Sequence, residues 1–554
     1  MKHFLILVSH LFLPFLVTAQ ITGPITSEFF SIRQNGVSTI VASGDTVWIS
    51  PSLNRNIGNA PEWDRMDGLD FIDEGKARVF SIDLKGDTVV AGLGFTSETL
   101  AGNQPAGFGY YISTDGGDTW RFSDFLLDED PPAKCDPSSS EYENPTSPGD
   151  YDPDCDIQFT YGGRTYNRIR ITVPQQSPPY NVAFKGNVIF SANWASGLLR
   201  STDLGETWER VILPPFNSPG LNPDQEYSWA SSFSYVDNSG SSESVIINRY
   251  DPVADDNLKG FALHIDSQNR VWFGSAGGIN VSENALTAPL DSIRWKNVNF
   301  DNSSNGLLAR WIIEIQEDPS NGRIWMTNWL AESTGSAFQG LDQFGIVYTD
   351  DGGESFKQRL IGQKILGITF KDGYVFAAGE NGLFISKDGG DTWTKSPQIK
   401  SANTFLKTTA EFQAATATND RVWISTSDGI ISTGDLGKTW EITRVNFPLS
   451  GGNTYDEDAA SVDSYAYPNP FSPIQHEIVR IRFKSSSAGT IKVRIFDFGM
   501  NLVRELDQLE ASSGEYEAIW NGIDQHGRKV ANGPYFYVIE AANETIKGKL
   551  LLIE

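Results

Sequence analysis

The run DYDPDCD, at residues 150–156, places a carboxylate at every second position, and three more acids lie upstream at 128–130. Carboxylates crowded in this way repel one another unless a hard cation neutralises them, and Ca²⁺ takes about six to eight oxygen ligands. The run lacks the glycine and the closing glutamate of an EF-hand loop, so a solvated acidic loop is the alternative. A structural Ca²⁺ ion is a candidate cofactor, and its candidate ligands are Asp150, Asp152, Asp154 and Asp156.

Two Asn-Trp pairs follow apolar runs, Asn193-Trp194 after VIFSA and Asn328-Trp329 after IWMT. An indole with an amide beside it suits stacking on a sugar ring or an aromatic group. The alternative is that each tryptophan packs between neighbouring sheets. We take these four residues as the candidate binding site.

The sequence carries no motif of a familiar catalytic centre. It lacks the HExxH, GxSxG and Walker A patterns, and its five His and two Cys offer no plausible Cys-His nucleophile. Glycoside hydrolysis needs only two facing carboxylates at a suitable separation. The 70 Asp and Glu residues therefore leave that reaction open.

An eight-residue pattern, Ser/Thr-x-Asp-x-Gly-x-Thr/Ser-Trp/Phe, recurs five times. The copies are STDGGDTW at 113–120, STDLGETW at 201–208, TDDGGESF at 349–356, SKDGGDTW at 386–393 and TGDLGKTW at 433–440. This is the chemistry of a hairpin turn, because the Asp carboxylate accepts bonds from turn amides and the Gly adopts a positive φ. The structural residues of these turns are Asp115, Gly117, Trp120, Asp203, Gly205, Trp208, Asp351, Gly353, Phe356, Asp388, Gly390, Trp393, Asp435, Gly437 and Trp440. We interpret the five carboxylates as structural rather than catalytic.

An apolar strand that follows a short turn recurs seven times, in DTVWIS at 45, DTVVAG at 87, NVIFSA at 187, RVWFGS at 270, RIWMTN at 323, YVFAAG at 374 and RVWIST at 421. Units repeating at about 40 to 50 residues suit four-stranded propeller blades. We therefore expect an all-β protein with a seven-bladed β-propeller at 20–448 and inserts near 123–165 and 214–257. The first and fourth units lack the turn pattern, but Trp63 and Trp295 can fill its Trp position.

The repeats resemble the bacterial neuraminidase repeat, or Asp-box, families, which include sialidases, sortilin-type propellers, xyloglucan-type endoglucanases and photosystem assembly propellers. The resemblance implies the propeller fold but no single activity. Sialidases carry an early Phe-Arg-Ile-Pro motif, and the nearest string here, FSIRQ at 30–34, does not match it. Xyloglucan-type endoglucanases pair carboxylates across two propellers, whereas we expect one propeller here.

The C-terminal region, 464–554, follows a polar and acidic linker at 449–463. It contains YPNPF at 467–471, alternating strands such as IKVRIFD at 491, and the segment WNGIDQHGRKVANGPYFYVIEA at 520–541. It resembles the FlgD-like immunoglobulin fold used as a sorting domain in type IX secretion. The resemblance implies a small immunoglobulin-like β-sandwich recognised by type IX-like export machinery, for secretion or surface attachment.

The overall charge and the N-terminus bear on compartment and partners. The net charge of −27 disfavours nucleic acid as a partner, because such binding relies on Lys and Arg. Residues 1–19 have the pattern of a signal peptide, and no later run is long enough to span a bilayer. We therefore expect a secreted or surface-attached protein in which Cys135 and Cys155 form a disulfide.

The leading hypothesis is an exported, non-catalytic propeller that binds a glycan or a protein. The rival hypothesis is an extracellular glycoside hydrolase of the Asp-box group, which requires two or three acids converging in the central pocket with raised or coupled pKa values. If each repeated turn joins the third and fourth strands of a blade, both inserts lie on the opposite face. We expect the ligand on that face, because binding residues concentrate on loops over a rigid scaffold.

Overall fold

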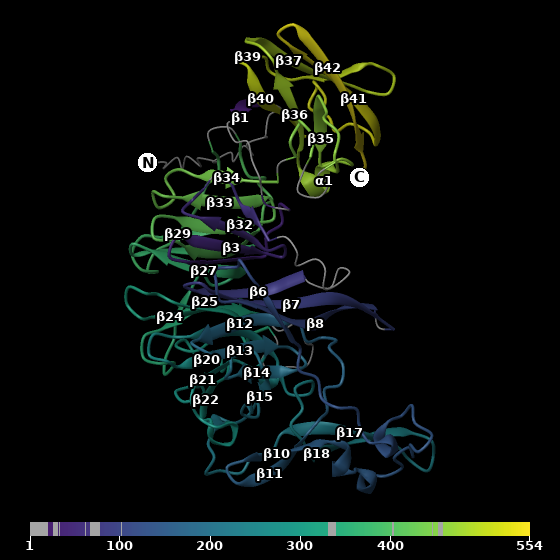
Figure 1. Cartoon of the computed structure of the whole chain (residues 1–554), viewed down its shortest axis with the longest axis vertical. Helices are drawn as coiled ribbons and strands as arrows, with labels where there is room; N and C mark the ends of the chain where they lie inside the picture. Colours follow the sequence, from purple (N-terminus) through teal and green to yellow (C-terminus); the bar gives the residue numbers. More distant parts are fainter. Residues whose placement is uncertain are drawn as a thin grey trace, which may run out of the picture. The chain divides into compact units, whose positions relative to one another are not determined.

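The computed structural model describes residues 20–25, 32, 34–60, 62–66, 78–100, 102–330, 340–401, 404–445, 447–452 and 458–554. The predicted signal peptide at 1–19 lies outside the described residues. The chain is almost entirely β-structure (Figure 1). It divides into two compact units: one contains 30–399 and 410–445, and the other contains 1–29, 400–409 and 446–554.

The larger unit contains seven antiparallel sheets in which successive strands are neighbours, as far as the described residues show. The first four are β2 to β5 (Thr39–Ser43, Thr46–Ser50, Asn54–Ile57, Asp64–Arg65), β6 to β9 (Arg78–Lys85, Thr88–Thr99, Gly102–Ser113, Arg121–Asp124), β12 to β15 (Pro179–Lys185, Val188–Asn193, Gly197–Ser201, Glu209–Arg210) and β19 to β22 (Gly260–Ile265, Val271–Ser275, Ile279–Ser282, Trp295–Val298). The others are β23 to β26 (Trp311–Glu317, Ile324–Trp329, Gly345–Thr349, Lys357–Arg359), β27 to β30 (Ile365–Lys371, Tyr374–Gly379, Gly382–Ser386, Thr394–Lys395) and β31 to β34 (Phe412–Ala417, Val422–Thr426, Gly429–Thr433, Glu441–Thr443). The short strand β16 (Gly220–Leu221) pairs with β22.

The first strand of each sheet contacts the first strand of the next, and β31 contacts β2, so the sheets close into a ring. The closure is hydrogen-bonded, because Val37 N–H donates to the Thr426 carbonyl at 3.2 Å and Gly429 N–H donates to the Asn35 carbonyl at 2.8 Å. Apolar second strands, such as VWFGS in β20, are fully buried because sheets cover them on both sides. This arrangement confirms the predicted all-β propeller.

The repeated turns join the third and fourth strands of their sheets. In the first, the Asp115 carboxylate accepts Thr119 N–H at 2.9 Å and Thr119 Oγ1–H at 2.6 Å, and Ser113 Oγ accepts Gly117 N–H at 2.8 Å. Gly117 has φ +97°, and a Cβ there would lie 2.4 Å from Trp48 of the preceding sheet. Trp120 packs edge-on against Trp48, with ring centroids 5.6 Å apart. The turn therefore joins two strands and also locks neighbouring sheets together.

The first and fourth sheets place a tryptophan where the turn pattern is missing. Trp63 lies just before β5, as Trp120 lies just before β9, and Trp295 is the first residue of β22. Both are buried. The sequence-based assignment of these two tryptophans agrees with the structure.

Two inserts each connect the fourth strand of one sheet to the first strand of the next. The first insert lies between β9 and β12, and the second lies between β15 and β19. They form the hairpins β10–β11 (Ile157–Tyr161, Arg164–Arg168) and β17–β18 (Ala230–Val236, Ser242–Asn248), together with short 3-10 turns at Ala133–Cys135, Pro148–Asp150, Pro153–Cys155 and Asp256–Leu258. The hairpins lie together, away from the stacked sheets, in the lower part of Figure 1.

The inserts are held to each other by a shared core and by buried charges. Tyr166 and Tyr227 pack against Trp229 with ring centroids 5.4 and 6.1 Å apart. Between the inserts, Arg249 of the second insert pairs with the buried Asp156 of the first at 3.5 Å. Within the first insert, Arg168 makes a bidentate pair with Asp128 at 2.6 and 2.8 Å, and Cys135 and Cys155 form the predicted disulfide. Burial raises the pKa of Asp128, but bonds from Arg168 and the charge of Arg210 outweigh it and lower the pKa below its usual value.

The smaller unit is a β-sandwich. One sheet has the order β1-β40-β36-β35 (Gln20–Ile25, Gly514–Trp520, Val479–Ser485, Ser464–Tyr467), and the other has β38-β37-β41-β42 (Leu502–Glu505, Gly489–Phe496, Gly533–Ala541, Glu544–Leu552) with β39 (Leu509–Ala511) beside β37. A short helix, α1 (Pro473–His476), precedes β36. The core contains Phe471, Trp520 and Tyr535. Two segments that the sequence analysis placed in the propeller, 20–25 and 400–409, cluster with this unit.

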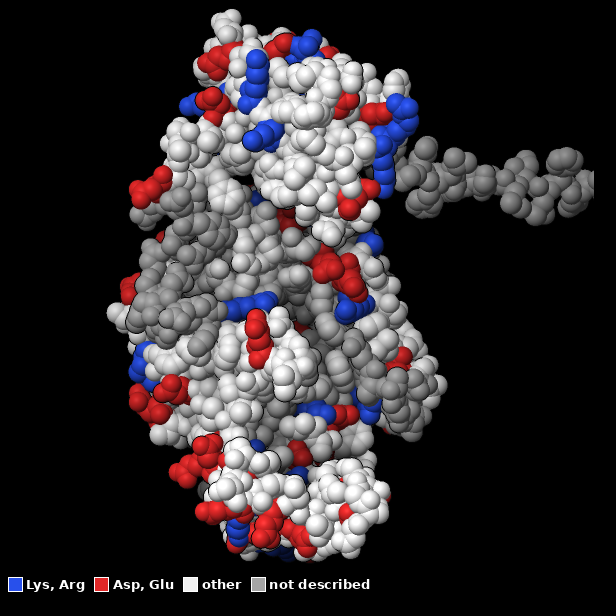
Figure 2. Space-filling view, turned by 90° about the vertical axis from the view of Figure 1, so that its right-hand side faces the viewer, with Lys and Arg blue, Asp and Glu red and all other residues white. Residues whose placement is uncertain are grey.

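None of the described helices is long and apolar enough to cross a membrane. On the face shown in Figure 2, acidic and basic side chains are interspersed over the surface.

Candidate functional site

The first strands of the seven sheets line a central channel with a cavity of about 300 Å³. Six of these strands carry a register irregularity near their beginning, where one residue is skipped in the pairing with the second strand. A bulge of this kind redirects a side chain. The skipped residues are Phe80, Tyr180, Phe261, Ile313, Leu366 and Gln413. All but Phe261 line the channel.

These skipped positions lie at the channel end that receives the inserts, because the inserts lead into first strands. The turns after the second strands lie at the same end, since first and second strands are antiparallel. The repeated Asp turns lie at the opposite end. The loops that carry the predicted binding residues therefore surround one mouth of the channel.

Five half-buried aromatic side chains form a continuous row at this mouth. Ring centroids are 6.3 Å apart for Phe80 and Tyr180, 5.9 Å for Tyr180 and Phe261, and 5.2 Å for Phe261 and Trp311. Trp194 packs against both Phe261 and Trp311, at 5.1 and 5.7 Å. We call these residues the aromatic row.

Two basic side chains lie on rings of the row. The Arg78 guanidinium is 5.3 Å from the Phe80 centroid, and Lys259 Nζ is 5.3 Å from that of Trp194. Cation–π contacts of this kind add stability and keep the charge at the surface of the ring. Of these two cations, only Arg78 lacks an ion pair with a described residue, because Lys259 also pairs with Asp256.

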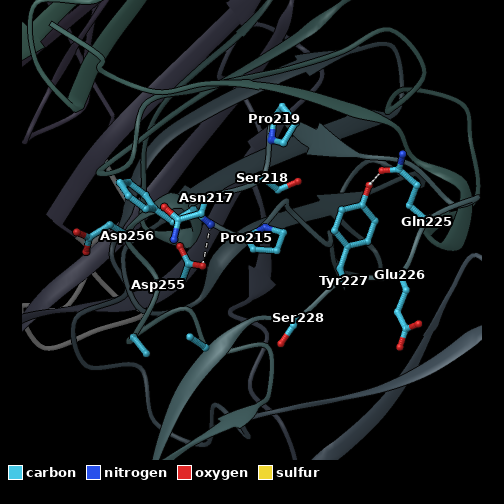
Figure 3. Close-up of a pocket in the computed structure, with 13 residues that line it drawn as sticks. Pro215, Asn217, Ser218, Pro219, Gln225, Glu226, Tyr227, Ser228, Asp255 and Asp256 are labelled. Atoms are coloured by element: carbon cyan, nitrogen blue, oxygen red, sulfur yellow. Dashed lines mark hydrogen bonds between the residues drawn. The ribbon is translucent and has the colours of Figure 1, made fainter.

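A pocket of about 580 Å³ in the second insert adjoins the aromatic row (Figure 3). Asp256, in its lining, binds Lys259 Nζ at 2.7 Å. Phe216, also in the lining, donates its N–H to Asp255 Oδ2 at 3.0 Å, and its ring lies 5.9 Å from the Arg310 guanidinium. Burial raises the pKa of Asp255 to about 6. Two contacts therefore connect the pocket to the surroundings of the row. Lys259, which lies over Trp194, pairs with Asp256, and Arg310, which precedes Trp311, lies over Phe216.

The structure divides the predicted binding residues by role. Trp194 belongs to the aromatic row. Trp329 is the cross-strand partner of Trp311 in β23 and β24; its indole N–H donates to the Ile365 carbonyl at 2.9 Å, and Lys364 lies over its ring. Asn193 is fully buried and donates to the Ser191 and Gly197 carbonyls.

Asn328 is also fully buried, and it has an indirect link to the site. Its Oδ1 accepts the N–H groups of Leu308 and Ala309 at 2.8 and 3.3 Å. It therefore fixes the segment that leads into Arg310 and Trp311. Both asparagines are therefore bonded to backbone groups of the propeller itself.

The four acidic residues proposed for Ca²⁺ each have protein partners. Asp150 accepts Thr146 N–H and Ser147 N–H, Asp152 pairs with Lys134, and Asp156 accepts the Tyr151 hydroxyl at 2.6 Å. Asp154 lies 3.5 Å from Lys134 Nζ. Within the part of the chain that the structure describes, no group of three or more His, Cys, Asp or Glu side chains is placed to hold a metal ion.

One carboxylate in the channel has a strongly perturbed titration. Glu314 lines the channel and accepts a hydrogen bond from Gln316 Nε2 at 2.6 Å. Glu314 is half-buried in the wall of the channel. Protein atoms surround most of its carboxyl group, and this burial raises its pKa to about 7. Asp83 also lines the channel, but Lys85 Nζ and Phe184 N–H bind it at 2.9 and 2.8 Å.

The carboxylates of the repeated turns have the opposite perturbation. Hydrogen bonds from Thr119 lower the pKa of Asp115 to about 2, and bonds from Thr392 do the same for Asp388. A carboxylate held ionised by its own turn is a poor proton donor or acceptor near neutral pH. The interpretation of these residues as structural agrees with this geometry.

Sequence reasoning missed four of the five rings of the aromatic row, Phe80, Tyr180, Phe261 and Trp311, and also Arg310. Each lies near the beginning of a first strand, whereas the recurrent sequence patterns mark second strands and turns. An aromatic residue close behind a basic one, as in RVF at 78–80, KGF at 259–261 and RW at 310–311, is the sequence signal that marks Phe80, Phe261 and Trp311.

A family model described as the FlgD Ig-like domain matches residues 475–545. The chain matches none of the curated proteins.

The fold resembles several solved structures at low identity. These are YCF48 bound to D1 peptide (15% identity, 76% of this chain and 96% of that chain, TM-score 0.38), the Niastella koreensis GH74 enzyme (12%, 97% and 75%, 0.43) and PorZ, described as an essential surface component of the type-IX secretion system of Porphyromonas gingivalis (11%, 94% and 75%, 0.32). These similarities concern the fold.

Proposed function

We propose that this chain is an exported or surface-attached binding propeller that performs no catalysis. In this proposal a glycan or protein ligand lies on the aromatic row, at the mouth of the channel that carries the inserts. The aromatic row is the observation that carries the proposal, because it joins half-buried rings from four successive sheets into one surface. Aromatic residues of this kind dominate the energy of binding sites.

The C-terminal sandwich has a separate role in the proposal. We propose that it directs type IX-like secretion or attachment to the cell surface. Its support is the match of residues 475–545 to the FlgD Ig-like domain. The disulfide in the first insert suits the oxidising surroundings of an exported protein.

Glu314 favours a second candidate, an extracellular glycoside hydrolase. A carboxyl group with pKa near 7 is suited to protonate a leaving group. Such a reaction also needs a second carboxylate on the opposite side of the sugar. Asp83, which also lines the channel, is engaged by Lys85 and by the Phe184 amide. This is why we rank binding above hydrolysis.

A glycan array and a panel of extracellular proteins, probed with the mature chain, test the binding proposal. We expect Trp194→Ala and Trp311→Ala to abolish the signals that the wild type gives. Phe498→Ala is the matched aromatic control, because Phe498 is exposed in the separate C-terminal sandwich, and it should retain them. Wild-type signals that survive in both row variants would refute the proposal.

Incubating the same glycans with the wild type and Glu314→Gln tests hydrolysis. Release of reducing ends by the wild type, lost in the variant, would replace the binding proposal with the enzymatic one.

A further inference from the structure

We propose that the aromatic row and its neighbouring arginines bind an acidic polysaccharide whose sugar rings carry carboxylates at intervals along the chain. This inference rests on the proposed binding function and names the chemical class of its ligand. It depends on two guanidinium groups: that of Arg78 lies over Phe80 at one end of the row, and that of Arg310 lies over Phe216 of the adjoining pocket.

Arg310 is a buried cation without an anionic partner. Only 8% of its surface is exposed, and its guanidinium packs on the Phe216 ring at 5.9 Å. It forms no hydrogen bond or ion pair with the residues that the structure describes. None of its nitrogens is among the fully buried atoms that lack a partner, so the charged end still reaches solvent and is open to a ligand. A ligand carboxylate would supply that partner, and guanidinium binds carboxylates in a bidentate fork.

Arg310 is positioned at the row by the fold around it. It directly precedes Trp311, and Asn328 binds the two preceding residues through their N–H groups. Its partner ring is also fixed, because Asp255 accepts Phe216 N–H and Asn299 Nδ2 donates to the Phe216 carbonyl. The site is therefore preorganised, which reduces the entropy lost on binding.

Arg78 provides a second cation, at the Phe80 end of the row. Its exposed side chain lies over Phe80 and makes no ion pair with a described residue. The rings of Phe80, Tyr180, Phe261 and Trp311 run from Arg78 to the residue that follows Arg310. Lys259, between them, is already neutralised by Asp256. A ligand that satisfies both arginines needs anionic groups separated by a stretch that packs on aromatic rings.

The pocket beside the row favours a saccharide over an acidic peptide. Its exposed lining includes the amides of Asn217 and Gln225 and the hydroxyl of Ser228 (Figure 3). The lining also contains Glu226, Asp255 and Asp256, so the pocket suits the hydroxyls of a sugar, and the carboxylates of the ligand must lie at the arginines. Side-chain amides and hydroxyls can donate hydrogen bonds to sugar hydroxyls and accept hydrogen bonds from them, whereas an extended peptide binds mainly through unpaired backbone N–H and carbonyl groups. An acidic peptide is therefore an alternative outcome of the test.

Calorimetric titration of the full mature chain with polygalacturonate tests the proposal. The comparison ligands are the same polymer with its carboxylates methyl-esterified and an acidic polyglutamate peptide. The variants are Arg310→Gln and Arg78→Gln, and Lys438→Gln, in a repeated turn at the opposite end of the ring, is the control. We expect polygalacturonate to bind, and Arg310→Gln to weaken it about tenfold or more, as for a lost charge-assisted bond. Arg78→Gln should have a smaller effect, because its cation is exposed, and Lys438→Gln should have none.

Thermal melting separates a binding role from a structural one. Arg310→Gln should melt close to the wild-type temperature, because the Arg310 guanidinium makes no hydrogen bond or ion pair with the residues that the structure describes. Loss of binding together with a lower melting temperature would indicate a structural role and overturn the proposal.

The comparison ligands separate the acidic-polysaccharide inference from the proposed binding function on which it rests. No binding of polygalacturonate, equal binding of its esterified form, or preferential binding of polyglutamate would overturn the acidic-polysaccharide inference. If another ligand still binds in a manner that requires Trp311, the binding function stands without it. If no ligand requires Trp311 for binding, both the acidic-polysaccharide inference and the proposed binding function are wrong.

Discussion

The Trp63 ring lies edge-on against Trp423, with 5.8 Å between centroids, and so joins the first sheet of the ring to the last. The two residues are 360 positions apart, yet both are nearly fully buried. They share a core with Ile32, Val37 and Ile430. This contact completes the ring, and the ring in turn brings the strands of the aromatic row together.

Trp63→Ala should therefore destabilise the propeller strongly. Removing a buried tryptophan side chain costs about 3–5 kcal/mol when the cavity does not collapse. Urea unfolding followed by tryptophan fluorescence measures the change. Leu100→Ala, at a fully exposed hairpin tip, is the control and should have no effect. A cost below about 1 kcal/mol for Trp63→Ala would mean that other contacts close the ring.

Asp388→Asn should lower the melting temperature at pH 7, because it weakens a turn held by Thr392 and Ser386. The pKa of Asp388 is lowered in the folded chain to about 2, so its contribution is present above its ordinary pKa near 4 and is lost as the pH falls toward 2. The difference between wild type and variant should shrink over that window.

Asp391→Asn, in the same turn, is the matched control for Asp388→Asn. The Asp391 carboxylate pairs with Arg359 and accepts no hydrogen bond from the described residues of its own turn. It should change the melting temperature little at any pH. An Asp388→Asn effect that stays constant down to pH 2 would contradict the assignment of these carboxylates.

Glu314→Gln should stabilise the propeller at high pH. The pKa of Glu314 is raised in the folded chain from 4.5 to about 7, so the stabilising effect of its bound proton is complete below pH 4.5 and is lost as the pH rises through 7. Wild type and variant should therefore diverge between pH 5 and 8, with the variant more stable by about 1–3 kcal/mol at pH 8. Denaturant unfolding across this range measures the divergence, and parallel curves would show that Glu314 stays ionised throughout.

Much of the fold could be predicted from the sequence because its signals are local. Each repeated turn carries its own hydrogen-bond partners within eight residues, and each buried second strand is a continuous apolar run. Trp63 and Trp295 could be assigned without the full pattern because they hold the same position relative to the fourth strand.

The site was less predictable because its residues meet only after the ring closes. Trp194, Phe261 and Trp311 come from three sheets, and a bulge redirects Phe261. Asn193 and Asn328 resembled ligand-binding amides in sequence, but both already bond to the backbone. Asn193 donates to the Gly197 carbonyl, and Asn328 accepts the Leu308 N–H. A sequence does not reveal whether an amide is already satisfied.

Gly23→Val should weaken the C-terminal sandwich. Gly23 lies in β1, with φ +139°, and a Cβ there would lie 2.7 Å from Tyr516 Cδ1 in β40. A branched side chain should therefore displace β1 and expose the edge of β40. Hydrogen exchange at 514–520 measures this, and Gly36→Val, where a side chain meets no atom within 4 Å, is the control. Unchanged protection of β40 in Gly23→Val would show that β1 contributes nothing to the sandwich.

The central claim is that the aromatic row is the ligand-binding surface. The most direct measurement is the dissociation constant of the wild type and of the double variant Trp194→Ala/Trp311→Ala for whichever ligand the wild type captures, with folding checked by circular dichroism. We predict a loss of about a hundredfold, equivalent to roughly 2.8 kcal/mol. A folded double variant that binds within twofold of the wild type would contradict the account.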